Sequence, residues 1–275
     1  MTEQHAPTAA DVGRMYDQST GLLSEVMGGN IHLGYWRDGD DDASVEEATD
    51  TLTDMVAERL ALAPGVRVLD IGCGSGKPAV RIAGNWDVHV TGITISAQQA
   101  EAAGARPEIG EGNGRVSFLQ ADGMDLPFAD ANFDRVYAIE SFLHMSDRAT
   151  AIAEAARVLR PGGTLVAANP YQQGELTPRE AEIVADNRRL FEIPPIGDAD
   201  EYAGHMGKAG LEVVEMLDIG ENVRRSHTLA AALIRHTQGT GGSAFSEELS
   251  RAADIIERFG ELPQIGYGLI VASRP

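Results

Sequence analysis

The sequence predicts an α/β protein in which a mostly parallel sheet carries helices on both faces. Two observations favour this fold. Short apolar runs of strand length alternate along the chain with segments in which apolar residues recur at helical spacing. The first of these runs, Val66–Ile71, leads through a glycine-rich turn into a helix, which is typical of the opening strand of such a sheet.

The elements before this strand are expected to be helical. A first helix begins at Asp11, which we expect to cap it, and a second runs from the capping box Ser44-x-x-Glu47 to about Leu62. Between them, the acidic run Asp38–Asp42 is expected to be a solvated loop, because its four carboxylates repel one another.

The rest of the chain alternates strands and helices. Strands are expected at residues 66–71, 88–94, 115–120, 134–140, 164–168, 211–219 and 264–273. One helix follows Pro78, and another runs from Asp147 to the segment Arg160-Pro161-Gly162-Gly163. Further helices are expected at residues 178–191, 198–208, 228–235 and 246–259, with a flexible loop at Gly239–Gly242.

Composition excludes several classes of partner. The formal net charge of −20 disfavours nucleic acids and anionic membrane surfaces, whose phosphates would be repelled. Cys73 is the only cysteine, so we expect neither an intramolecular disulfide nor a thiolate metal cluster, and no other metal-ligand spacing stands out. An apolar run long enough to cross a membrane is absent, and a cytoplasmic protein is expected.

The turn after the first strand has the pattern D-x-G-x-G-x-G, with Asp70 at the end of the strand. This spacing fits neither the dinucleotide motif G-x-G-x-x-G nor a phosphate loop, in which a Ser or Thr would follow Lys77 in place of Pro78. Glycines allow a sharp bend and a close approach of the backbone to a ligand. A carboxylate beside them would repel a pyrophosphate and suits a cationic ligand.

The stretch V-L-D-I-G-C-G-S-G at 68–76 resembles the donor-binding motif of the class I S-adenosylmethionine (SAM)-dependent methyltransferases. The resemblance covers nearly the whole chain and is closest to the natural-product branch typified by the rebeccamycin sugar O-methyltransferases. It implies a Rossmann-like seven-stranded sheet with an N-terminal cover and an inserted helical cap. Supporting blocks include I-H-L-G-Y-W at 31–36, T-G-I-T-I-S-A-Q-Q at 91–99, A-D-G-M-D-L-P-F at 121–128 and E-S-F-L-H-M-S-D-R at 140–148.

The resemblance also implies a division of the chain and a set of residues that bind SAM and its product S-adenosylhomocysteine. Residues 1–62 would form the cover, 63–168 the SAM-binding core, 169–209 the cap that meets the substrate, and 210–275 the rest of the core with inserted helices. The cofactor-binding residues implied are Asp70, Gly72, Cys73, Gly74, Gly76, Lys77, Ile93, Thr94, Gln99, Asp122, Gly123, Met124 and Glu140.

Some of these residues also have a purely structural interpretation. Tyr16, Tyr35 and Trp36 either line the SAM site or only pack the cover onto the sheet. Asp122 either accepts a hydrogen bond from adenine or caps its own turn. Gln99 takes the place of the acidic residue that binds the ribose hydroxyls in many relatives, unless it simply lies at the surface.

At the methyl acceptor, His144 is the candidate general base, because it follows the fourth strand and a neutral imidazole is available near neutral pH. Sugar O-methyltransferases of this branch have a second histidine where Leu143 stands and an Asp where Asn169 stands. Asn169 can form hydrogen bonds but cannot take a proton. Either His144 alone serves an oxygen acceptor, or an electron-rich carbon is methylated and aromatic faces and Glu140 stabilise the resulting cation.

We therefore expect a SAM-dependent methyltransferase that acts on an oxygen or carbon atom of a bulky, mostly apolar natural product. One alternative is a cyclase on the same scaffold that uses SAM or S-adenosylhomocysteine only as a structural part, and a further one is a pure binding or regulatory module. A homo-oligomer is compatible with each of these interpretations.

Overall fold

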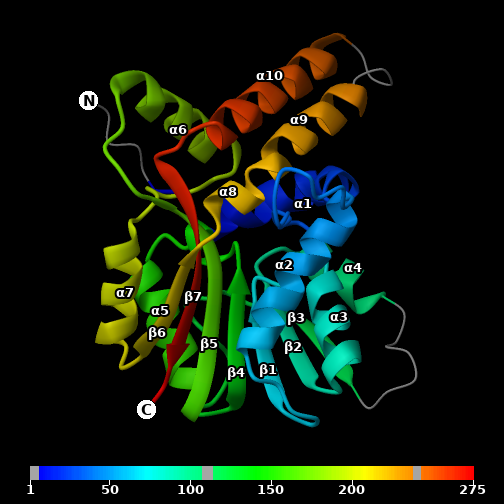
Figure 1. The fold of residues 1–275 in the computed structure, drawn as a ribbon. Coiled ribbons are helices and arrows are strands. Elements are labelled where there is room, and N and C mark those ends of the chain that lie inside the picture. The colour runs from blue at the N-terminus through cyan, green and yellow to red at the C-terminus, as the bar shows by residue number, and fades with distance from the viewer. Residues whose placement is uncertain (1–5, 107–113, 238–242) are drawn as a thin grey trace.

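The structure, a computed structural model, describes residues 6–106, 114–237 and 243–275. Its centre is a seven-stranded sheet in the order β3-β2-β1-β4-β5-β7-β6 (Figure 1). Strand β7 runs antiparallel to both of its neighbours, and the other strands pair in parallel. The expected α/β fold is thus confirmed. The strands are β1 Arg67–Ile71, β2 His89–Thr94, β3 Arg115–Gln120, β4 Phe133–Ile139, β5 Leu159–Gln172, β6 Glu212–Asp218 and β7 Ile265–Ser273.

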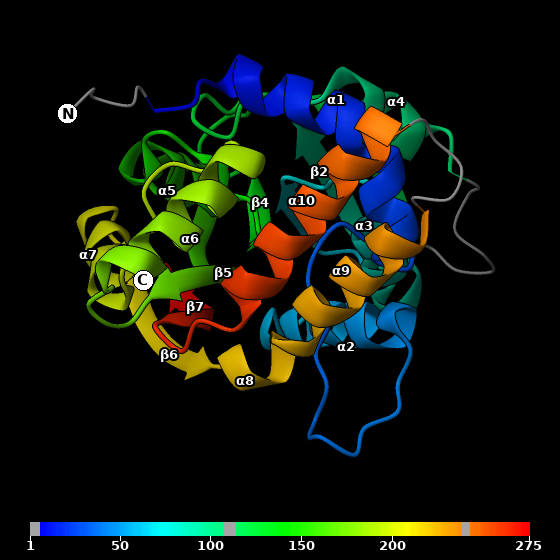
Figure 2. The ribbon, with the colours of Figure 1, turned by 90° about the horizontal axis from the view of Figure 1, so that it is seen from above.

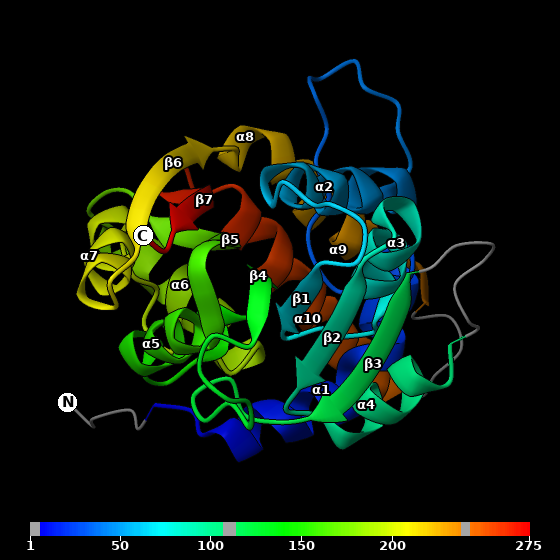
Figure 3. The same ribbon diagram turned by 90° about the horizontal axis from the view of Figure 1, so that it is seen from below.

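Helices cover both faces of the sheet (Figure 3). On one face, α2 (Val45–Arg59) and α3 (Lys77–Trp86) enclose an apolar cluster that includes the buried Leu52 and Ile82. On the other face, α5 (Arg148–Val158) and α7 (Ala199–Lys208) enclose a second cluster with Ile152 and Met206. Apolar side chains on both faces bury the central strands, as is typical of a parallel sheet, whereas the edge strands β3 and β6 are largely exposed.

A separate group of helices lies across the carboxyl edge of the parallel strands (Figure 2). It contains α1 (Ala9–Val26), α6 (Pro178–Leu190), α9 (Arg225–Thr237) and α10 (Ser243–Gly260), with the short α8 (Gly220–Val223) leading in. Helix α4 (Ala97–Gly104) and a 3-10 turn at Phe142–His144 complete the chain. Of the stretch expected to be a cap, α6 belongs to this group, whereas α7 packs on the sheet beside α5.

Several element boundaries differ from those predicted, and two of the differences have a clear local cause. Helix α1 is capped by Thr8 and not by Asp11, because the Thr8 hydroxyl accepts from the Asp11 amide while the Asp11 carboxylate accepts from the Thr8 amide. Helix α5 ends at Val158, before the Pro-Gly-Gly segment, because Leu159 already pairs with Phe133 of β4. The capping box at Ser44 and Glu47 is confirmed. The loop expected at Gly239–Gly242 falls at 238–242, outside the described residues.

Candidate active site

The glycine-rich turn packs so tightly that side chains would not fit in it. Gly72, Gly74 and Gly76 all have positive φ, of 83°, 51° and 77°. A Cβ on Gly72 would lie 2.3 Å from the Cβ of Ser141, and one on Gly76 would lie 2.8 Å from that of Ala103. Only glycine meets both demands without strain. The turn therefore brings bare backbone to the carboxyl end of β1.

A cavity of about 880 Å³ opens beside this turn, and we refer to it as the donor pocket. It collects most of the predicted SAM-binding residues from the ends of four strands and from the N-terminal cover. Those that line it are Tyr16, Asp70, Gly72, Cys73, Gly74, Ile93, Thr94, Gln99, Asp122, Gly123, Met124 and Glu140, and the candidate base His144 lines it as well. Ligands are expected at this edge of an open α/β sheet.

Asp70 is the buried carboxylate of the donor pocket. It is 2% exposed and accepts a hydrogen bond of 2.7 Å from the hydroxyl of Tyr137, its neighbour on β4. Burial raises the pKa of Asp70 to about 7, and the Tyr137 hydrogen bond offsets this only in part. A cationic ligand nearby would restore the charged form, so the residues present suit a sulfonium nucleotide.

The polar side chains on either side of the pocket are already hydrogen-bonded within the protein. Gln99 accepts from the Thr94 hydroxyl at 2.6 Å and donates to the Thr20 hydroxyl at 2.9 Å, which ties α1 to the β2–α4 turn. Asp122 accepts from the amide of Met124 at 2.8 Å, so it caps its own turn while also lining the pocket. Each has one further lone pair or proton with which to bind a ligand.

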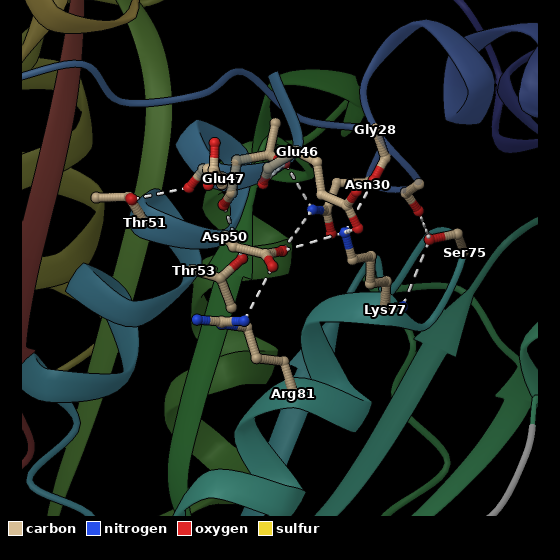
Figure 4. Close-up of polar contacts among 12 residues, drawn as sticks. Gly28, Asn30, Glu46, Glu47, Asp50, Thr51, Thr53, Ser75, Lys77 and Arg81 are labelled. Carbon is tan, nitrogen blue, oxygen red and sulfur yellow. Dashed lines mark hydrogen bonds and ion pairs between the residues drawn. The ribbon is translucent and has the colours of Figure 1, made fainter. Parts of the chain in front are cut away.

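Lys77 does not line the donor pocket, contrary to the prediction. Its ammonium group donates to the carbonyl of Gly28 at 2.8 Å and pairs with Glu46 at 2.9 Å and Asp50 at 3.3 Å (Figure 4). These partners draw the side chain away from the glycine turn and toward the cover. Gly76 does not line the pocket either. It forms the N-cap of α3.

Tyr35 and Trp36 do not line the site either, and the packing interpretation of these rings holds. Trp36 is 2% exposed, donates from Nε1 to the carbonyl of Ala43 at 2.9 Å, and lies under the guanidinium of Arg225. Tyr35 packs against the apolar cluster of α2 and α3. Both rings are used in attaching the cover to the rest of the protein.

A second cavity of about 1,120 Å³ adjoins the donor pocket, and we refer to it as the acceptor chamber. Its wall comes mainly from apolar side chains of α1, α9, α10 and the segment after α6. The two cavities share a boundary formed by Tyr16, Ile31, His32, Glu140 and His144. A reaction between ligands of the two cavities would take place at these five residues. His32 was not predicted, since only its position on the folded cover brings it here.

His144 is held at this boundary by Tyr16. The Tyr16 hydroxyl lies 2.7 Å from Nε2 of His144, and the two rings meet edge to face. Burial lowers the pKa of His144 to about 4, and the nearby backbone of Glu192 and Phe191 opposes this only in part. The imidazole is therefore neutral at physiological pH. In the tautomer that carries its hydrogen on Nδ1, the lone pair of Nε2 can accept a proton.

Glu140 stands at the same boundary in a strained conformation, with φ at +48°. Its Oε1 accepts from the amide of Leu33 and from the hydroxyl of Tyr267, both at 2.8 Å. Burial raises the pKa of Glu140 to about 7. This carboxyl group therefore fastens the cover at residue 33 to β7.

Asn169, by contrast, is buried between β4 and β7 and lines neither cavity.

Comparison with known proteins shows the family to which the chain belongs. Residues 69–167 match the methyltransferase domain family. The O-methyltransferase rstn1 of Aspergillus nomiae is 47% identical over 213 residues, which are 78% of this chain and 94% of that protein. The protein is a class I SAM-dependent methyltransferase. The 27-O-demethylrifamycin SV methyltransferase of Amycolatopsis mediterranei is 41% identical to it, over 98% of each chain.

Solved structures place the methyltransferase in the same fold. The [4+2]-cyclase SpnF has a TM-score of 0.83 and 34% identity, with 98% of this chain and 97% of that chain covered. A mycolic acid cyclopropane synthase, CmaA1, crystallised with S-adenosylhomocysteine, has a TM-score of 0.78 at 20% identity. Among the described residues, none of the helices is long and apolar enough to cross a membrane.

Proposed function

We propose that this methyltransferase methylates a hydroxyl group of a bulky, mostly apolar natural product, with His144 as the general base. The observation that carries the proposal is the position of His144 in the wall shared by the donor pocket and the acceptor chamber. Two relatives support an oxygen acceptor, an O-methyltransferase at 47% identity and a 27-O-demethylrifamycin SV methyltransferase at 41% identity.

The donor pocket would hold SAM through the glycine turn and Asp70, with Gln99 and Asp122 at its sides. When bound there, SAM supplies a methyl group activated by its sulfonium. The buried Asp70 carboxylate favours a positive charge close by, and the closely packed cover excludes water from the boundary. The protein thus binds the methyl donor and the acceptor, aligns them, and keeps water out of the site. These are the main requirements of an in-line displacement.

His144 would accept the proton of the acceptor hydroxyl group. The acceptor hydroxyl replaces the Tyr16 hydroxyl at Nε2 and is aimed at the donor pocket. Its O–H proton would pass to Nε2 as its oxygen takes the methyl group that bound SAM would supply, with S-adenosylhomocysteine as the leaving group. The lowered pKa of His144 means that the imidazolium then returns its proton to solvent readily when product leaves.

The test is an assay with labelled SAM and a panel of hydroxylated apolar polyketides, among them 27-O-demethylrifamycin SV. We expect labelled methyl ether in the product, and expect it to fall with His144→Gln. Labelled methyl on carbon, or no change with His144→Gln, would contradict the proposal.

The likeness to SpnF at 34% identity favours one second candidate, a cyclisation without methyl transfer. Conversion of a polyene substrate to a cyclic product with no release of S-adenosylhomocysteine would establish this function in place of the first.

A further inference from the structure

The acceptor chamber holds a second group of polar side chains that the proposed methyl transfer does not use. Most of its wall is apolar, and Tyr16, His32, Glu140 and His144 belong to the boundary with the donor pocket. The exceptions lie elsewhere in the chamber. They are Asn187 on α6, His227 on α9, Arg224 just before α9, and Tyr267 on β7, whose hydroxyl already donates to Glu140.

His227 is fitted into the wall by its neighbours on α10. Its ring meets that of Phe259 edge to face, at 5.7 Å between centroids. A Cβ on Gly260 would lie only 2.4 Å from the Cβ of His227, so the absence of a side chain at 260 makes room for the imidazole. His227 lines the acceptor chamber but not the donor pocket. Within the described part of the chain, neither ring nitrogen has a hydrogen-bond partner.

Asn187 is 4% exposed and also faces the chamber. Its backbone carbonyl accepts from the amide of Phe191, whereas its side-chain amide has no hydrogen-bond partner among the described residues. Buried polar groups are nearly always paired in native proteins, and an unpaired one costs stability. Both side chains face the chamber, so a ligand that occupies it can supply their hydrogen-bond partners.

The third polar residue, Arg224, shows which ligand group would not bind. Its guanidinium donates to the carbonyl of Gly260 at 2.6 Å and to the carboxylate of Glu221 at 2.8 Å. Its guanidinium is therefore already engaged within the protein, although Glu221 is largely exposed to solvent. A carboxylate or phosphate in the chamber would lose its hydration without gaining a cation.

We propose that His227 and Asn187 form a polar subsite that binds an uncharged oxygen function, a hydroxyl or a ketone, on the part of the acceptor remote from the methylated atom. This proposal rests on the proposed function, because it takes the chamber to be the acceptor site. It adds that the natural acceptor carries a second oxygen function on an otherwise apolar body. A site with unpaired polar groups discriminates strongly against analogues that lack the matching group.

The protonation state of His227 agrees with a neutral ligand. Burial lowers the pKa of His227 to about 4, and the charge of Arg224 acts in the same direction. At neutral pH the ring therefore offers one N–H donor and one acceptor nitrogen. The Asn187 amide offers donors and an acceptor as well, so each of the two side chains can pair with either a hydroxyl or a carbonyl oxygen.

The experiment measures binding and requires no turnover. The full chain is first titrated with S-adenosylhomocysteine by calorimetry, and this step alone tests the donor pocket of the proposed function. The complex is then titrated with 4-phenylphenol and with biphenyl, which share an apolar frame and differ in one hydroxyl. We expect 4-phenylphenol to bind about tenfold more tightly, as one buried hydrogen bond would give.

Variants then locate the preference. His227→Phe keeps the aromatic contact with Phe259 and should remove most of the tenfold difference in affinity. Asn187→Leu should reduce the same difference. Because two variants are used, the test still works if one of them folds poorly. His227→Gln restores a hydrogen-bonding amide and should recover part of the preference. The matched control is His236→Phe, the same change at an exposed position of α9. Equal affinity of the two probes for the wild type, or a preference that survives both His227→Phe and Asn187→Leu, would overturn the subsite.

Discussion

The hydroxyl of Tyr16 lies 2.7 Å from Nε2 of His144, although 128 residues separate them in the sequence. This contact joins the cover helix α1 to the turn after β4 and closes the wall between the donor pocket and the acceptor chamber. Both residues line both cavities. The nitrogen that would take the acceptor proton is thus held in place by a group that the acceptor itself can replace.

Replacement of His144 tests the base. With an oxygen acceptor, His144→Gln should lower kcat by roughly 10²–10⁴, because proton transfer by a positioned side chain contributes that much. Tyr16→Phe should change kcat by less than about tenfold, since the acceptor hydroxyl replaces the Tyr16 hydroxyl in the reactive complex. Steady-state rates at saturating SAM measure both. A larger loss for Tyr16→Phe than for His144→Gln would reverse these two roles.

Glu140 should make stability depend on pH. Its pKa is raised from about 4.5 to about 7, so the folded state favours the protonated carboxyl. This contribution to stability is complete below about pH 4.5 and is lost as pH rises toward 7. Glu140→Gln keeps an oxygen that accepts from Leu33 and Tyr267 but cannot ionise.

The melting temperature of Glu140→Gln relative to the wild type should therefore rise between about pH 5 and about pH 8. Glu182→Gln, at an exposed position of α6, is the matched control and should show no such trend. A difference between Glu140→Gln and the wild type that stays constant over this range would contradict the buried, proton-binding carboxyl.

Lys77 should matter for attachment of the cover and not for direct contact with the donor. Lys77→Met removes its hydrogen bond to Gly28 and its ion pairs with Glu46 and Asp50, and we expect a loss of about 1–3 kcal/mol in the free energy of unfolding. Lys208→Met, at an exposed position of α7, is the control and should have little effect. Urea titration measures both. An unchanged stability for Lys77→Met would show that the ion pairs contribute nothing to the folded state.

Much of the fold could be predicted because its signals are local. Apolar runs gave the strands, and the capping box at Ser44 and Glu47 gave the start of α2. The end of α5 was predicted to lie at the Pro-Gly-Gly segment, and this was wrong. Pairing of Leu159 with β4 starts β5 earlier than local propensity indicates. The start of α1 was misplaced by one turn because Thr8 and Asp11 cap it together.

The donor pocket was also largely predictable, because its residues follow the ends of successive parallel strands. The exceptions depend on partners far along the chain. Lys77 lies beside the glycine turn in sequence, but acidic residues of α2 hold it elsewhere. Tyr267 reaches Glu140 across 127 residues, and His227 enters the chamber only because Gly260 packs against it. Sequence patterns of one segment contain no signal for such contacts.

The central claim is that the donor pocket binds SAM beside the buried Asp70 carboxylate, and calorimetric titration with SAM tests it most directly. Near pH 7 the wild type should bind SAM and release a fraction of a proton, because a cation lowers the raised pKa of Asp70. The measured heat should then depend on the ionisation enthalpy of the buffer. Asp70→Asn should bind much more weakly and without this dependence. Equal binding by the two proteins, with heats independent of buffer, would contradict the account.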